Sequence, residues 1–108
     1  MQESTALRAF AALAHETRLA VLRLLVPQGA DGLSAGDLAK QTNCSASALS
    51  FHLSTMEDAG LVTSAKQSRN VIYRADYDNL SGLIHYLTED CCCAHPDVCG
   101  SLNHSSSC

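Results

Sequence analysis

Residues 45–60 have the sequence SASALSFHLSTMEDAG, the most informative part of the chain for its fold. Leu49, Leu53 and Met56 recur at the spacing of one helical face, so the stretch predicts a helix with a single apolar stripe. Ser45 is the expected N-cap, because its side-chain oxygen can accept a hydrogen bond from a free backbone N–H of the first turn. Almost every side chain opposite the stripe is small or hydroxylic.

The face opposite this stripe has the chemistry of a surface that reads DNA. With Leu53 directed into the core, five side chains point outward or flank the outward face: Ser47, Ser50, Phe51, His52 and Ser54. Small hydroxylic side chains let a helix approach the base edges of the major groove and form hydrogen bonds there. Two roles fit Phe51, contact with a thymine methyl group or packing against a neighbouring hairpin. His52 fits either a DNA contact or a partly buried histidine.

The segment before this helix predicts a helix-turn-helix. Ser34, with Asp37 three residues later, marks the start of a short helix that runs to about residue 41. Asn43 and Cys44 then form the expected turn. A short helix, a tight turn and a longer helix in this order are typical of DNA-binding proteins.

The segment after the helix predicts a β-hairpin. Two short runs, residues 61–65 and 71–75, alternate or are β-branched, and a polar, basic tip at 66–70 joins them. Lys66 and Arg69 in this tip are expected to contact phosphates or the minor groove. The fold class is therefore mainly α with a small β-hairpin (α+β), a winged helix-turn-helix.

Three further helices are expected around this core. Two of them each have an apolar face: the first, at residues 4–14, and the last. The last helix is expected to start near residue 78 and to extend to the cysteine run 91–93. The faces of these two helices are formed by Leu7, Phe10, Ala11 and Ala14, and by Leu80, Leu83, Ile84 and Leu87. Because a chain of 108 residues would struggle to bury both faces, we expect a homodimer, paired through its first and last helices, on a pseudo-palindromic operator of double-stranded DNA.

The helix expected at residues 16–26 has a clear division of its side chains. Its inward side chains are predicted to be Leu19, Leu22, Leu25 and Val26. Its outward side chains are predicted to be Arg18 and Arg23.

Charge divides the chain into two parts. Residues 1–75 hold all 7 basic residues and 6 acidic ones, a net of +1, whereas residues 76–108 hold 5 acidic residues and no basic one, a net of −5.

No apolar run is long enough to span a bilayer and no signal peptide is evident, so we expect a cytoplasmic protein without a membrane partner. We expect a DNA-binding and dimerisation domain at 1–95 and a flexible cysteine-containing tail at 96–108.

Cysteine is just as unevenly distributed as charge. Five of the six cysteines lie in the last 18 residues: Cys91, Cys92, Cys93, Cys99 and Cys108. The sixth, Cys44, fits a small buried apolar residue. A group of thiols at one end of an otherwise cysteine-poor chain favours soft-metal binding or redox chemistry over a disulfide scaffold.

Three stretches resemble the ArsR/SmtB family of repressors. Residues 12–25, ALAHETRLAVLRLL, are similar to the opening helices of that family. Residues 49–62, with LSFHL followed by AGLV, are similar to its recognition helix and the exit from it. Arg69 and Tyr73 match the pattern of the family's wing, although Ser68 stands where glycine is usual.

The resemblance implies a repressor that a metal or metalloid releases from DNA. The helix before the turn lacks the cysteine pair of the family's best-known arsenic site, and the last helix lacks most of the histidines of its zinc site. What remains is similar to a branch with a C-terminal site for As(III) or Sb(III), here formed by Cys91, Cys92, Cys93 and Cys99. Either Cys91 with Cys92 or Cys92 with Cys93 can supply the adjacent pair.

An alternative interpretation retains the DNA-binding surface but has no metal or metalloid effector. Adjacent cysteines near Cys99 can form a disulfide or persulfide, which would make the chain a thiol-redox repressor. No pair of groups with catalytic spacing is evident, so we expect no enzymatic activity.

Overall fold

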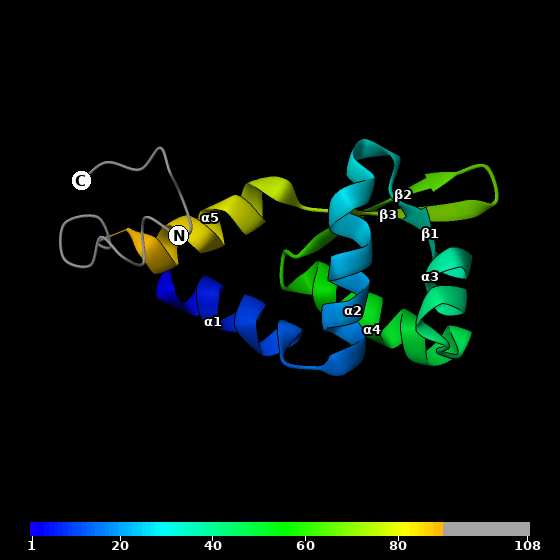
Figure 1. The fold of residues 1–108 in the computed structure, drawn as a ribbon, viewed down its shortest axis with the longest axis horizontal. Coiled ribbons are helices and arrows are strands. Elements are labelled where there is room, and N and C mark those ends of the chain that lie inside the picture. Colours follow the sequence, from blue (N-terminus) through cyan, green and yellow to red (C-terminus); the bar gives the residue numbers. More distant parts are fainter. Residues whose placement is uncertain (90–108) are drawn as a thin grey trace.

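The computed structural model describes residues 1–89, and Figure 1 shows their arrangement. Its elements are α1 (Glu3–Leu13), α2 (Glu16–Leu25), the 3-10 helix η1 (Val26–Asp31), β1 (Leu33–Ser34), α3 (Ala35–Thr42), α4 (Ala46–Asp58), β2 (Val62–Gln67), β3 (Asn70–Ala75) and α5 (Tyr77–Thr88). The expected α+β class is confirmed: the described residues are mainly helical, and one small antiparallel sheet lies at one side of the helices (Figure 1). None of the helices in this part of the chain is long and apolar enough to cross a membrane.

The helix-turn-helix consists of α3 and α4, and local chemistry sets its boundaries. The Ser34 hydroxyl accepts a hydrogen bond from the Asp37 N–H at 3.1 Å, and the Ser45 hydroxyl accepts one from the Ala48 N–H at 3.2 Å. Between the helices Asn43 adopts a left-handed conformation with φ 55°, which ends α3. Both predicted N-caps are therefore confirmed.

The sheet has the strand order β1–β3–β2, and both pairings are antiparallel. The short strand β1 was not foreseen from the sequence. The hairpin tip is tighter than predicted, because Lys66 pairs with Val71 and Gln67 pairs with Asn70. The connection is thus reduced to Ser68 and Arg69, and Ser68 takes a positive φ of 55° that permits the tight turn.

The core lies beneath α4 and is closed by α2, α3 and the start of the hairpin. Leu49, Leu53 and Met56, the predicted stripe of α4, are buried. The prediction for α2 was partly wrong: Leu22 and Leu25 are buried as expected, but Val21 takes the place of Leu19 and Val26, which are exposed.

The contacts of α1 explain why its leucine and phenylalanine stay outside. This helix turns Ala6, Ala9 and Ala12 toward the body of the protein, because a face of alanines lets two helix backbones approach closely. Leu7 and Phe10 therefore lie on the opposite side, 61% and 36% exposed.

Helices α1 and α5 lie beside each other at one end of the molecule, away from the hairpin (Figure 1), and Met1 reaches Gly82 of α5. Leu83 is buried, whereas Ile84 and Leu87 of the same helix are 54% and 61% exposed. We call the four exposed residues Leu7, Phe10, Ile84 and Leu87 the apolar end face.

Two glycines before β1 provide a test of the backbone geometry. Both have positive φ, 61° at Gly29 and 63° at Gly32, but a Cβ on Gly32 would lie 2.3 Å from the Tyr73 carbonyl oxygen, whereas a Cβ on Gly29 would meet nothing within 4 Å. We expect Gly29→Ala to lower the free energy of unfolding by about 1–3 kcal/mol, the cost of a side chain at this backbone conformation (φ 61°, ψ −140°), which essentially only glycine adopts. Gly32→Ala should cost distinctly more in the same urea titration, because β1 must move off β3. Equal losses would contradict this close packing.

Candidate nucleic-acid interface

The outward face of α4 carries the side chains that the sequence singled out. Ser47, Ser50, Phe51 and Ser54 are all exposed, on the side opposite the buried stripe. Phe51 is 66% exposed, so most of its ring faces solvent, which favours a contact with DNA over packing against the hairpin. The face is thus a row of serines around one projecting phenyl ring.

His52 is half-buried, and a hydrogen-bonded arginine holds its ring. Arg18 lies 3.1 Å from His52 Nδ1 through its Nη1 atom, and its Nε donates to the Ala12 carbonyl at 2.5 Å. Because a guanidinium can only donate, Nδ1 must accept, and in the neutral ring the proton sits on Nε2. The ring of His15 lies against the same imidazole, with centroids 4.5 Å apart.

Arg18 is the functional neighbour that the sequence did not reveal. It was predicted to point outward, but it is half-buried and joins α1, α2 and α4. The pair is separated by 34 residues, and no local pattern links positions so far apart.

The pKa of His52 gives a pH-dependent prediction. Burial, followed by the nearby His15 and Arg18, lowers the pKa of His52 below its ordinary value of 6.5. Because folding disfavours the protonated ring, this contribution to stability is complete above pH 6.5 and falls as the pH drops through the lower folded-state pKa. We expect the urea midpoint to fall between about pH 7.5 and about pH 5.5, and to fall less in His52→Gln. Parallel pH profiles for the two proteins would contradict this assignment.

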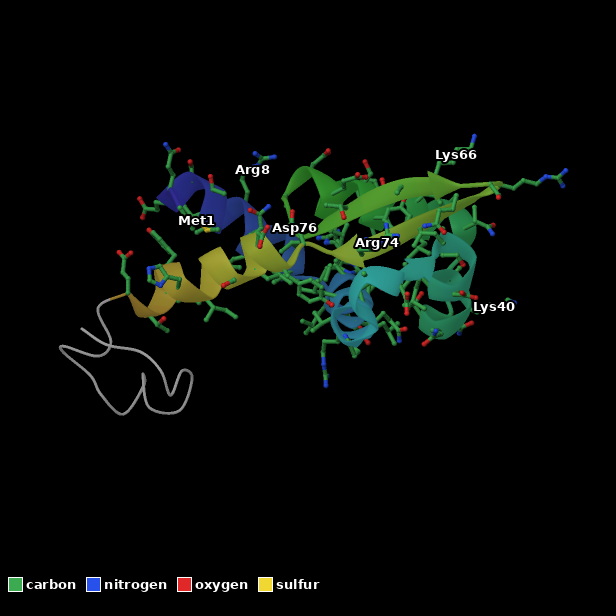
Figure 2. All side chains as sticks on the ribbon, turned by 90° about the horizontal axis from the view of Figure 1, so that it is seen from above. Met1, Arg8, Lys40, Lys66, Arg74 and Asp76 are labelled. Atoms are coloured by element: carbon green, nitrogen blue, oxygen red, sulfur yellow. The ribbon has the colours of Figure 1, made fainter. Side chains whose placement is uncertain are left out.

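The hairpin supplies exposed positive charge. Lys66 projects from the hairpin into solvent (Figure 2), and Arg69 occupies the two-residue turn at its end. Both side chains are exposed. A hydrogen bond of 2.8 Å from the Ser64 hydroxyl to Glu57 connects β2 to α4, so the hairpin and the outward face of α4 belong to one unit.

Three of the seven lysine and arginine side chains stabilise the fold through hydrogen bonds to the main chain. Arg8, Arg18 and Arg74 donate to the main-chain carbonyls of Asp58, Ala12 and Ala30. The remaining four are exposed: Arg23, Lys40, Lys66 and Arg69. The few positive charges available to a polyanion therefore include both hairpin residues named from the sequence.

The C-terminal end of α4 is held by helices α1 and α5. Arg8 of α1 donates to the Asp58 carbonyl at 2.9 Å, and Asn79 of α5 donates to the Gly60 carbonyl at 3.0 Å. Asp76 caps α5 by accepting from the Asn79 N–H at 3.1 Å. A side-chain hydrogen bond therefore links α5 directly to the residues that follow α4.

The cysteines named as effector ligands, Cys91, Cys92, Cys93 and Cys99, lie outside the described residues, as does Cys108. Cys44 is half-buried and packs against the core. Among residues 1–89, no group of three or more histidine, cysteine or acidic side chains is arranged to hold a metal ion.

Comparison with known proteins agrees with this geometry. A helix-turn-helix domain family model matches residues 13–65. The transcriptional regulator YgaV of Escherichia coli is 36% identical over 81 residues, which cover 75% of this chain and 80% of YgaV. The transcriptional activator HlyU of Vibrio cholerae is 34% identical over 76 residues, covering 70% of this chain and 68% of HlyU.

Among solved structures, HlyU of Vibrio cholerae superposes with a TM-score of 0.67 at 31% identity, covering 85% of this chain and 99% of HlyU. An ArsR-like transcriptional regulator from Rhodococcus superposes with a TM-score of 0.72 at 28% identity, covering 97% of this chain and 96% of that one. The chain belongs to the ArsR-type winged helix-turn-helix regulators. In this winged helix-turn-helix, α4 occupies the position of the recognition helix and the β2–β3 hairpin that of the wing.

Proposed function

We propose that this ArsR-type regulator is a homodimeric repressor that leaves its operator when trivalent arsenic or antimony binds its C-terminal cysteines. The observation that supports the DNA-reading half is the outward face of α4, where exposed serines stand beside an exposed basic wing. The sensing half is supported by the four cysteines at 91, 92, 93 and 99 and by the resemblance to the C-terminal arsenic branch.

DNA reading divides between the helix and the wing. Ser47, Ser50 and Ser54 offer hydroxyl groups that both donate and accept, which suits base edges and phosphates in the major groove. Lys66 and Arg69 neutralise phosphates but carry no sequence information themselves. With a net charge of only +1 over residues 1–75, one chain has few phosphate contacts to offer, and a dimer doubles them.

The wing gives a prediction about salt dependence. Replacing both Lys66 and Arg69 by alanine removes two phosphate contacts per chain, or four per dimer. We expect operator binding to weaken roughly tenfold, and the slope of log K against log salt concentration to become shallower by about 3.5. Fluorescence anisotropy across a salt series measures both quantities. Arg23→Ala on α2 is the control and should leave the slope unchanged; an unchanged slope in the wing variant would remove the wing from the interface.

The apolar end face supports the dimer. Ile84 and Leu87 of α5, with Leu7 of α1, are each more than half exposed on one end of the molecule. Large apolar side chains that are exposed in this way favour a protein–protein interface, and pairing two copies through them would bury the same residues on both sides of a two-fold axis.

Release follows from the position of the cysteines relative to α5. Cys91 comes two residues after Glu89, and α5 connects to the recognition helix through Asn79 and to η1 through Tyr77, whose hydroxyl donates to the Val26 carbonyl. A soft, three-coordinate ion bound by these thiolates would act on the end of the helix that we assign to the dimer interface. A coupling of about 1–3 kcal/mol is enough to weaken DNA binding severalfold to a hundredfold.

The experiment titrates a fluorescent operator complex under reducing conditions with arsenite, antimonyl tartrate and Zn(II), and in a separate arm with a mild oxidant. We expect DNA release by the two metalloids only. Release by the oxidant alone would favour the thiol-redox repressor. An operator-driven reporter tests the direction of regulation: expression should fall with the regulator present and return with arsenite, and a rise with the regulator alone would overturn the repressor role.

A further inference from the structure

Phe51 is the one large apolar side chain on the outward face of α4, and it lies outside the buried core. It is 66% exposed, whereas the other large apolar residues of this helix, Leu49, Leu53 and Met56, are at most 1% exposed. It also lies on α4 and not on the apolar end face of α1 and α5. An exposed phenyl ring contributes little to folding, so its role must lie in what α4 contacts.

The serines around Phe51 shape its surroundings. Ser47 and Ser54 stand one helical turn before and after it, and Ser50 precedes it directly. All three are exposed and short, so the ring stands above its neighbours and reaches any partner of α4 first.

The ring has a fixed support on one side. Phe51 and His52 meet edge to face, with centroids 5.8 Å apart and planes at 65°. His52 is held by Arg18, which is itself bonded to the Ala12 carbonyl of α1. The side chain next to the ring is thus tied to two other helices, which limits the directions that the phenyl group can take.

We propose that Phe51 determines sequence specificity by contacting the C5-methyl group of a thymine in the major groove. This rests on the proposed DNA reading by α4. A phenyl ring has no hydrogen-bonding group, so it cannot recognise the polar edge of guanine, adenine or cytosine. The thymine methyl is the apolar feature of the major-groove edge, and contact with it distinguishes T from C.

A second way to use an exposed aromatic ring is insertion between base steps, which unstacks and kinks the duplex. The two modes differ in a measurable way. Contact with a methyl group disappears when thymine is replaced by uracil, which pairs identically and lacks only that methyl. Insertion depends on the flexibility of the step and tolerates the change.

The experiment first selects tight-binding duplexes from a randomised library with the full-length protein. Each thymine of the selected site is then replaced by deoxyuridine in turn, symmetrically in both half-sites, and affinity is measured by fluorescence anisotropy. We expect one thymine per half-site whose demethylation weakens binding about fourfold per half-site, hence about 15-fold for the symmetric change. In Phe51→Ala the same change should alter affinity less than twofold, and Phe51→Leu should retain part of the effect.

Replacing that T·A pair by C·G and then by 5-methyl-C·G provides a second readout, because methylation should restore part of the lost affinity in wild type but not in Phe51→Ala. Methyl dependence that is absent, or equal in wild type and Phe51→Ala, would overturn the proposal while leaving DNA binding by α4 intact. Failure of the protein to select any duplex would overturn the proposed function as well. Phe51→Ala should unfold at the wild-type urea midpoint, which separates a lost contact from lost folding.

Discussion

Replacing Ile84 by glutamate is expected to convert the dimer into a monomer and to weaken operator binding by at least about 100-fold. Ile84 is 54% exposed on α5, within the apolar end face. A carboxylate at this position would have to be buried without a partner when two copies meet, which is unfavourable. Two recognition helices on one operator bind far more tightly than either alone, so loss of pairing appears directly as loss of affinity.

Leu19→Glu is the matched control for this change. Leu19 is 48% exposed on α2, outside the apolar end face, so the same substitution alters charge and hydropathy equally. Sedimentation equilibrium and anisotropy should show a dimer with wild-type affinity for Leu19→Glu and a weakly binding monomer for Ile84→Glu. A dimeric Ile84→Glu protein would place the interface elsewhere.

Replacing Leu53 by alanine is expected to lower the free energy of unfolding by about 3 kcal/mol. Leu53 is 1% exposed and belongs to the core beneath the recognition helix. Removing its branched end leaves a cavity that α4 cannot close without moving, so operator affinity should fall together with stability. Urea denaturation measures the first effect and anisotropy the second.

Ser54→Ala tests whether this loss is specific to the core. Ser54 follows Leu53 directly but is exposed on the outward face. Its substitution should change stability by no more than about 0.5 kcal/mol. A loss below about 1 kcal/mol for Leu53→Ala would mean that α4 is not anchored through its apolar stripe.

The recognition helix was predictable because its signals are local. The stripe of Leu49, Leu53 and Met56 repeats within one helix, and Ser34 and Ser45 cap helices whose free N–H groups lie three residues away. Such patterns involve only residues that are close together in the sequence. They can therefore be recognised without knowing the tertiary structure.

The errors arose where packing between distant segments decides. On α2, Leu19 was expected to face the core but is 48% exposed, and Val21 is buried in its place. The Arg18–His52 pair joins residues 34 apart and leaves no mark on local periodicity.

Other departures lay at the ends of elements. The wing was predicted with a tip of five residues, but strand pairing continues to Gln67 and Asn70 because Ser68 can adopt a positive φ.

The assignment of Cys91, Cys92, Cys93 and Cys99 depends on residue chemistry and family resemblance, since these positions lie outside the described residues.

We propose that residues 1–89 read DNA while the cysteines beyond them sense the effector. To test this claim, operator affinity is measured for the wild type and for a variant with Cys91, Cys92, Cys93 and Cys99 all replaced by serine, each with and without arsenite under reducing conditions. We predict equal affinities without arsenite, and at least roughly tenfold weaker binding on arsenite addition in the wild type alone. Arsenite that weakens binding equally in both proteins, or in neither, would contradict the claim.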